Sequence, residues 1–254
     1  MQGNYKKAEE ILLNVAEHFK ENNVNDLAAV YLNIGDAYLR QHKGDYGESY
    51  FKKTIEIDPK CASAYNGLGR IYYRRGNLDK AEDCFKECLV HDKQYTRACC
   101  NLGMTYTDKE NYAEAKLLFE KALTLSDAAR DILLAKFDRG NMYKKQGLLE
   151  DAIKDYEDVV ALDKDHMEPY IELKDAYVKN GDNDKATECQ QQIDRLYANN
   201  VLKTVSGERD KIGLEQLNQQ HERARVNRRQ DRDAVKMNVK PEKPPRDERP
   251  TKSL

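Results

Sequence analysis

The chain has 254 residues, 35% of them charged, and a formal net charge of −2 at neutral pH. No stretch approaches the roughly 18 consecutive apolar residues of a membrane-spanning helix, so we expect no membrane span. The near-zero charge argues against nucleic acid as the main partner. Residues 1–20 carry lysines and glutamates and lack an apolar core, so we expect no secretory signal and a cytoplasmic protein.

Residues 1–27 predict a single helix, because Ile11, Leu12, Val15 and Phe19 follow the helical period. This segment is similar to the second half of the two-helix units that follow it, with the first half absent. We therefore expect a half repeat or a capping helix here. A chain that is a fragment of a longer array would explain the same pattern.

The next part of the chain is periodic. Glycines recur every 34 residues at Gly35, Gly69 and Gly103, each three residues before a tyrosine. The pattern continues at Gly140 after 37 residues and at Lys174 after another 34. The tyrosines of the five copies are Tyr38, Tyr72, Tyr106, Tyr143 and Tyr177. A fixed interval of this length predicts one supersecondary unit repeated along the chain.

A second set of positions recurs in phase with the first. Nine residues beyond each tyrosine stands a small residue: Gly47, Ala81, Ala115, Ala152 or Ala186. Four residues further on, the first four copies have an aromatic residue: Phe51, Phe85, Phe119 or Tyr156. Apolar spacings of three and four predict helices, and turn residues such as Gly76-Asn77 separate the halves. Each unit is therefore predicted to be two antiparallel helices, and the shared phase disfavours a non-repetitive bundle.

The run Tyr65–Tyr73, followed by Gly76-Asn77, Ala81 and Phe85, resembles a tetratricopeptide repeat. The resemblance implies an all-α fold, an α-solenoid of stacked antiparallel helix pairs wound into a right-handed superhelix. The expected repeats span residues 28–61, 62–95, 96–129, 133–166 and 167–198.

Two of the copies depart from the family pattern. The fourth has Lys136 and Arg139 where an aromatic residue and a leucine are expected, and the fifth has Lys174 and Gln190. A three-residue insertion within 126–131 precedes the fourth copy and lengthens its interval.

The repeated glycines carry a physical implication. A glycine inside a helix costs about 1 kcal/mol relative to alanine, so something must offset that cost at each copy. Two helices can cross closely only where one of them presents little side chain. We therefore expect close helix contacts at Gly35, Gly69, Gly103 and Gly140, with aromatic rings filling the space between helices.

The last part of the chain changes composition. Residues 199–236 predict one polar helix that closes the array, and residues 237–254 predict a disordered, basic, proline-rich tail. Residues 221–254 contain eleven Lys and Arg against six Asp and Glu.

Six cysteines are present, and Cys84 lies one helical turn before Cys88. Zinc sites usually show two short ligand pairs, so one pair with His91 or Cys99 makes a weak case, and we expect no metal and no other cofactor. Disulfides are not expected in a reducing compartment. No phosphate-binding glycine loop, nucleophile elbow or His-Glu-x-x-His motif is present, so we expect no enzyme.

In tetratricopeptide arrays the first helix of each unit lines the concave face, so the resemblance places a partner groove there. The groove candidates are Asn33, Arg40, Asn66, Arg70, Tyr73, Arg74, Arg97 and Asn101. Guanidinium groups pair bidentately with carboxylates, and asparagine amides hold an extended backbone. We therefore expect a protein partner that presents a peptide segment of acidic character.

Other residues refine this expectation. The equivalent face of the later units is acidic, with admixed lysines: Asp138, Glu168, Glu172 and Asp175, beside Lys144, Lys145 and Lys179. The family's chaperone-binding arrays clamp a terminal carboxylate with lysines and asparagines, but Leu32, Asp36 and Gly67 stand at the first of those positions. Clamping of a chaperone tail is therefore not expected.

The function expected is a scaffold or adaptor that binds proteins without catalysis. One alternative is an RNA-associated factor whose basic segment contacts phosphates: Arg223, Arg225, Arg228, Arg229 and Arg232. Acidic residues interrupt that segment and no aromatic residue in it could stack on bases, which disfavours nucleic acid. A second alternative is a regulatory subunit of an enzyme complex. The sequence leaves the partner and the oligomeric state open.

Overall fold

The computed structural model describes residues 24–201, and these residues are helical apart from short connections. Most of the half repeat predicted at 1–27, most of the predicted closing helix and the predicted tail lie outside the described residues. The helices are α2 (Val24–Arg40), α3 (Gly44–Ile57), α4 (Ala62–Arg74), α5 (Leu78–His91), α6 (Thr96–Asp108), α7 (Tyr112–Leu125), α8 (Ala129–Gln146), α9 (Leu149–Leu162) and α10 (Met167–Asn180). A further helical stretch covers 183–201.

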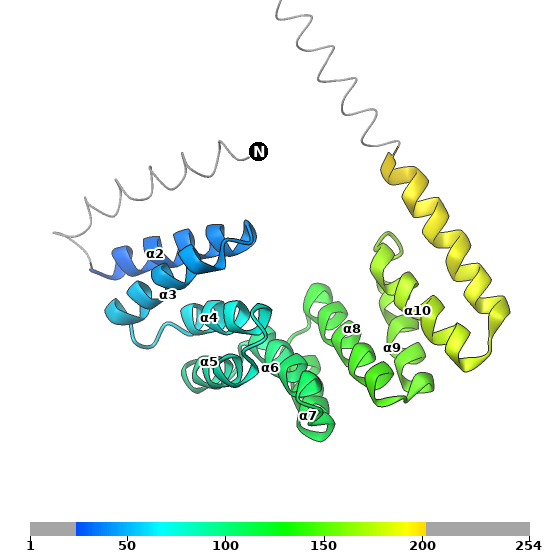
Figure 1. Ribbon diagram of the computed structural model, residues 1–254, viewed down its shortest axis with the longest axis horizontal. Coiled ribbons are helices and arrows are strands. Elements are labelled where there is room, and N and C mark those ends of the chain that lie inside the picture. The colour runs from blue at the N-terminus through cyan, green and yellow to red at the C-terminus, as the bar shows by residue number, and fades with distance from the viewer. Residues whose placement is uncertain (1–23, 202–254) are drawn as a thin grey trace, which may run out of the picture. The chain divides into compact units, whose positions relative to one another are not determined.

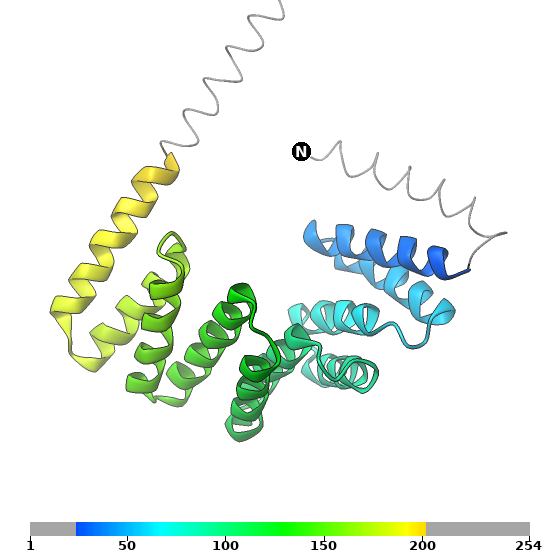
Figure 2. The same cartoon turned by 180° about the vertical axis from the view of Figure 1, so that it is seen from behind.

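The helices are arranged as consecutive pairs (Figures 1 and 2). The closest packing is within the pairs α2–α3, α4–α5, α6–α7 and α8–α9, and each second helix also contacts the first helix of the next pair. First helices contact the next first helix, whereas α3, α5, α7 and α9 are not in contact with one another. The prediction of an all-α solenoid of stacked helix pairs is confirmed.

Each repeated glycine packs directly against an aromatic ring of the second helix of its pair. A Cβ atom built on Gly35, Gly69 or Gly103 would lie 2.8, 2.5 or 2.8 Å from the nearest ring carbon of Phe51, Phe85 or Phe119. Such distances are shorter than real Cβ atoms tolerate, so only glycine allows this approach. The rings are buried, which explains why four helical glycines occur despite their cost.

The fourth pair repeats this arrangement with a tyrosine. A Cβ atom on Gly140 would lie 2.7 Å from the ring of Tyr156, and the Tyr156 hydroxyl donates a hydrogen bond of 2.7 Å to Asn141 Oδ1. The fifth pair consists of α10 and the helical stretch 183–201, and here Lys174 replaces the glycine and Gln190 replaces the ring. The Lys174 ammonium donates to Gln190 Oε1 at 2.8 Å, so a hydrogen bond takes the place of the ring contact.

The residues of the fourth copy that depart from the family pattern are paired with carboxylates of α9. The Arg139 guanidinium donates two hydrogen bonds of 2.7 Å to Asp155, whose carboxylate is buried. Lys136 forms an ion pair with Asp158. Charge pairs between α8 and α9 therefore stand where the family has apolar contacts.

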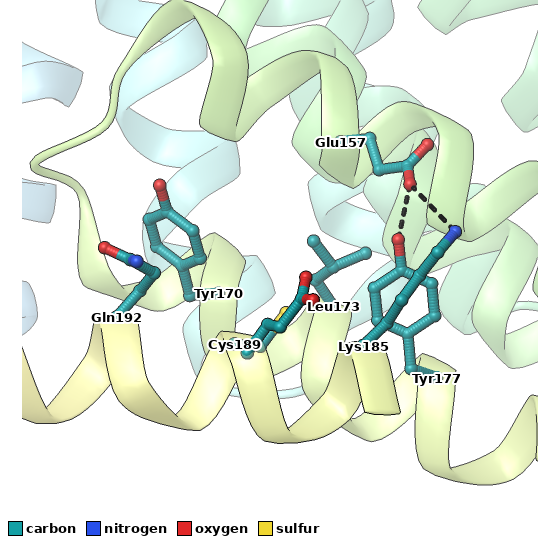
Figure 3. Close-up of a pocket in the computed structure, with 8 residues that line it drawn as sticks. Glu157, Tyr170, Leu173, Tyr177, Lys185, Cys189 and Gln192 are labelled. Carbon is teal, nitrogen blue, oxygen red and sulfur yellow. Dashed lines mark hydrogen bonds and ion pairs between the residues drawn. The ribbon is translucent and has the colours of Figure 1, made fainter. Parts of the chain in front are cut away.

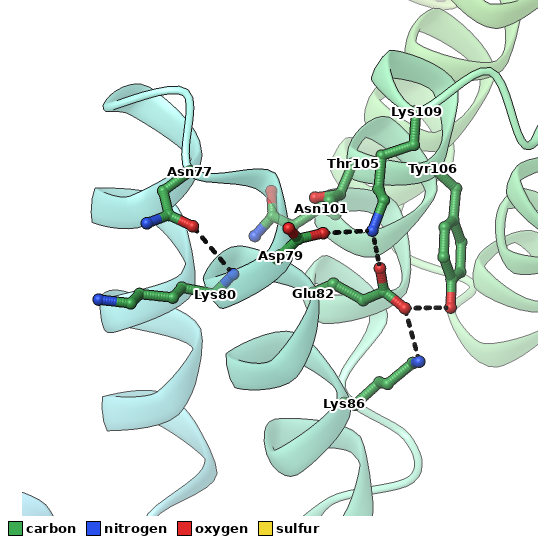
Figure 4. A network of polar contacts seen from close by, with 9 residues as sticks. All are labelled: Asn77, Asp79, Lys80, Glu82, Lys86, Asn101, Thr105, Tyr106 and Lys109. Carbon is green, nitrogen blue, oxygen red and sulfur yellow. Dashed lines mark hydrogen bonds and ion pairs between the residues drawn. The ribbon is translucent and has the colours of Figure 1, made fainter.

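A polar network, which we call the junction network, joins the second and third pairs (Figure 4). The Glu82 carboxylate accepts hydrogen bonds from Lys86 at 2.6 Å, Lys109 at 2.6 Å and Tyr106 at 3.1 Å. Lys109 also contacts Asp79 at 2.7 Å. Burial disfavours the charged carboxylate, but these donors outweigh burial and lower the pKa of Glu82 to about 2.

An equivalent network around Glu48 joins the first and second pairs. Glu48 accepts from Tyr72 at 2.9 Å and from Arg75 at 2.5 Å, and its salt bridge to Lys52 measures 2.7 Å. Its pKa is also lowered to about 2, because these hydrogen bonds outweigh burial. At the third junction the equivalent residue is Lys116, whose ammonium lies 5.9 Å from the ring centroid of Tyr143.

The buried apolar residues are distributed unevenly along the stack. From Cys99 in α6 to Cys189 they form one continuous cluster. The buried residues from α2 to Leu102 form three smaller clusters. The junction without a network is thus spanned by a continuous apolar core.

We predict that Gly69→Ala destabilises the protein, although alanine is the better helix former by about 1 kcal/mol. The new methyl group would collide with Phe85 in a packed core, and overpacking of this kind costs about 1–3 kcal/mol. Urea unfolding of Gly69→Ala alone and in a Phe85→Leu background measures the effect. The loss should shrink or reverse once the ring is gone, and an equal loss in both backgrounds would refute the contact.

We predict that Glu48 and Glu82 make the fold sensitive to acid. Because their pKa values in the folded protein lie below the ordinary 4.5, their contribution is complete above about pH 4.5 and disappears as the pH falls toward 2. Glu82→Gln should cost about 1 kcal/mol at neutral pH and reduce the loss of stability on acidification. Urea unfolding at neutral and acidic pH tests this, with the exposed Glu114→Gln as control. The same pH profile in Glu82→Gln and wild type would contradict it.

Candidate partner-binding face

The first helices α2, α4, α6, α8 and α10 lie next to one another, and we call the surface formed by their outward side chains the first-helix face. The predicted groove residues all lie on three of these helices. Asn33 and Arg40 are on α2, four residues are on α4, and Arg97 and Asn101 are on α6. Those on α4 are Asn66, Arg70, Tyr73 and Arg74.

Four of these residues form an arginine cluster, which we define as Arg40, Arg70, Arg74 and Arg97. Burial raises the pKa of Asp36, and the charges of Arg70, Arg40 and Arg97 act in the opposite direction, so these three arginines lie within electrostatic reach of Asp36. Burial, followed by the charge of Arg74, lowers the pKa of Arg70. Three helices thus bring the guanidinium groups of Arg40, Arg70 and Arg97 near one carboxylate, and Arg74 lies near Arg70.

Most donors of the arginine cluster are free of protein partners. Arg74 donates one hydrogen bond of 3.1 Å to the backbone oxygen of Leu39. Within residues 24–201, Arg40, Arg70 and Arg97 make no hydrogen bond and no ion pair, although Arg70 is half-buried. Arg70 is thus a half-buried guanidinium near two like charges, those of Arg74 and Arg97, and one carboxylate, that of Asp36.

The other predicted groove residues differ in accessibility. Asn101 donates from Nδ2 to Asn66 Oδ1 at 2.8 Å, and Asn66 is only 5% exposed. The Tyr73 hydroxyl donates a hydrogen bond to Asp108, and burial, followed by this hydrogen bond, raises the pKa of Tyr73. Asn33 is exposed. The structure therefore uses Asn66 to join α4 and α6, and leaves Asn33 on the surface.

The acidic residues of the later units are mostly paired. Lys144 contacts Glu172 and Asp175, and Lys179 contacts Asp175 at 2.9 Å. Lys145 forms an ion pair with Asp108. Of the acidic residues predicted on this face, only Asp138 and Glu168 have no lysine or arginine partner in the described part of the chain.

Asp138 differs from the others because it is buried. Its side chain is 6% exposed, and its Oδ2 atom is buried without a hydrogen-bond partner. Burial, reinforced by the charge of Glu168, raises its pKa to about 7. Asp138 on α8 occupies the same repeat position as Asn101 on α6. The neighbour of Asn101 in the first helix of the preceding pair is Asn66, whereas the corresponding neighbour of Asp138 is Cys100. Comparison of the repeats position by position could have found this mismatch.

A separate pocket lies among α9, α10 and the helical stretch that begins at 183 (Figure 3). Its volume is about 260 Å³. Glu157 accepts a hydrogen bond from Tyr177 and lies 3.9 Å from Lys185. The eight lining residues are Glu157, Tyr170, Leu173, Tyr177, Lys185, Glu188, Cys189 and Gln192. Burial raises the pKa of Cys189, so its thiol is protonated and not an activated nucleophile.

Within residues 24–201, no group of three or more His, Cys, Asp or Glu side chains is placed to hold a metal ion. Burial raises the pKa of Cys84 to about 11 and that of Cys88 to about 12, which disfavours the thiolates a metal requires. No helix in the described residues is long and apolar enough to cross a membrane. The arginines of the RNA alternative lie beyond the described residues.

Stacked pairs of antiparallel helices, four of them with a glycine under an aromatic ring, define a helical repeat protein. A sequence model of the tetratricopeptide repeat matches residues 26–94 and 61–128, and a second one matches residues 135–166. The chain belongs to the tetratricopeptide repeat family. A search of curated proteins gave no match.

Solved structures of the same fold share little sequence with this chain. BtubC from P. vanneervenii aligns with a TM-score of 0.64 and 18% identity over 77% of this chain and 89% of that one. Pseudomonas aeruginosa pilF aligns at 0.62 and 19% over 67% and 77%. YrrB, described as a TPR protein with an unusual peptide-binding site, aligns at 0.52 and 20% over 76% and 96%. The fold and the family make this chain a protein–protein interaction scaffold.

Proposed function

We propose that this scaffold acts without catalysis by holding a peptide segment of a partner protein on the first-helix face, with acidic residues of the segment on the arginine cluster. The observation that carries the proposal is Arg70. It is half-buried among Arg40, Arg74 and Arg97, and it has no hydrogen bond or ion pair within residues 24–201.

Electrostatics favours an acidic ligand over a purely structural role. The guanidinium groups of Arg40, Arg70 and Arg97 act on one carboxylate, Asp36, and Arg74 adds a further positive charge near Arg70, so the cluster carries excess positive charge. Bringing like charges together has a cost that a carboxylate from a partner would remove. Planar guanidinium groups bind carboxylates through paired hydrogen bonds, which gives such a site both affinity and orientation.

Neighbouring residues suit an extended segment. Asn33 is exposed on α2, and an asparagine amide can both donate to and accept from a peptide backbone. The ring of Tyr73 is partly exposed beside the cluster, with its hydroxyl held by Asp108. A peptide site described for YrrB, which shares the fold, makes this mode of binding reasonable.

The cysteines support the cytoplasm as the place of action. All six lie in the described residues as free thiols, and Cys88, Cys99 and Cys100 are buried. Unpaired thiols at this density are typical of a reducing compartment.

We predict that Arg70→Glu combined with Arg97→Glu removes partners that bind through the cluster. Two reversed charges would repel an acidic segment and should weaken its binding at least tenfold, because each close charge pair contributes about 1 kcal/mol or more. The measurement is quantitative affinity purification of the tagged chain from cells, with crosslinks located by mass spectrometry.

The matched control is Lys60→Glu combined with Lys93→Glu, which changes the net charge equally at two exposed turns. Partners should remain with the control and disappear with the arginine variant, and crosslinks in the wild type should reach α4 and α6. Identical partner sets for the two variants would refute the proposed site.

A further inference from the structure

We infer that Asp138 receives a basic side chain of the bound segment, so that the segment carries acidic residues for the arginine cluster and a lysine or arginine for α8. This inference rests on the proposed function and adds a second charge of opposite sign to the ligand. It assigns to Asp138 the role of a specificity-determining residue.

The geometry at Asp138 is that of an incomplete ion pair. The side chain is more than nine-tenths buried, and Oδ2 has no hydrogen-bond partner. Its titratable neighbours come from four helices: Tyr73 of α4, Cys100 of α6, Tyr156 of α9 and Glu168 of α10. None of them is a cation, and Glu168 adds a second negative charge.

The cations nearest along the chain are already engaged. Arg139 is paired with Asp155, Lys144 with Glu172 and Asp175, and Lys145 with Asp108. A structural carboxylate beside so many basic residues would be expected to recruit one of them, since unpaired buried charges are costly. Asp138 therefore stays available to a donor from outside the chain.

The position of Asp138 on the first-helix face supports this assignment. It stands at the repeat position of Asn101 on α6 and Glu172 on α10, both of which are partly exposed, and α8 contacts α6 directly. Adjacent packed helices lie about 8–10 Å apart, and an extended chain advances about 3.3 Å per residue. About three to six residues should thus separate the acidic and basic parts of the ligand.

Binding of a basic side chain to Asp138 should also depend on pH. Burial and Glu168 raise the pKa of Asp138 to about 7, whereas binding of a cation requires the charged carboxylate. The contribution of the basic side chain should therefore be complete at about pH 8 or above and decrease as the pH falls through 7 toward 6.

The test is a selection from a displayed library of random peptides against the full chain at about pH 8, where Asp138 is charged. Enriched peptides should combine acidic residues with a lysine or arginine at a constant spacing. Asp138→Asn should select the same acidic residues without the basic one, and Arg70→Gln with Arg97→Gln should lose the acidic residues. Asp151→Asn, at an exposed position of α9, is the control of equal charge and should behave as the wild type.

A change in the ligand makes the test independent of how the variants fold. Replacing the selected lysine or arginine by glutamine in a labelled synthetic peptide should weaken its binding to the wild type about tenfold, and much less at about pH 6. Acidic enrichment without a basic residue would overturn this inference and leave the proposed function standing. Enrichment of neither acidic nor basic residues would overturn both this inference and the proposed function. A preference for a basic residue that persists in Asp138→Asn would show that another residue binds it and would overturn the role of Asp138.

Discussion

The array depends on a steric constraint between the two helices of each of the first four pairs. An aromatic ring of the second helix rests on a glycine of the first, at a distance that excludes any Cβ atom. This contact sets how closely the paired helices approach and therefore where each first helix presents its outward side chains. Residues from α2, α4 and α6 converge on one face because the same contact between a glycine and a ring recurs in the first three pairs. The arginine cluster is thus a product of the packing as much as of its own sequence.

The periodic part of the fold could be predicted from the sequence. Gly69, Tyr72, Ala81 and Phe85 recur in phase, and recurrence of that kind indicates helix pairs whatever lies on their surface. The pattern could not show how departures from it are accommodated, because compensation depends on contacts between helices. Arg139 reads as a defect in an apolar position, but it is paired with the buried Asp155.

The candidate site was predictable in outline only. Basic residues on first helices indicated an acidic ligand, and the structure shows how Arg70 is enclosed by its neighbours. Asn66 shows the limit, because its exposure depends on the next helix and not on its own repeat position. Asp138 was one acidic residue among several in the sequence. Its isolation became visible only when the lysines around it were found to be paired elsewhere.

The cohesion between repeats changes chemical character along the chain. The first two junctions combine small apolar clusters with the ionic networks around Glu48 and Glu82. From α6 onward one apolar cluster runs through the stack, beside ion pairs such as Lys145–Asp108 and Lys144–Glu172. Ionic contacts weaken with added salt, and apolar contacts weaken on cooling. Salt should therefore act on ion pairs along the whole stack, whereas cooling should act most on the carboxy-terminal units, where the apolar cluster is continuous. A solenoid built in this way has two different sensitivities to its surroundings within a single chain.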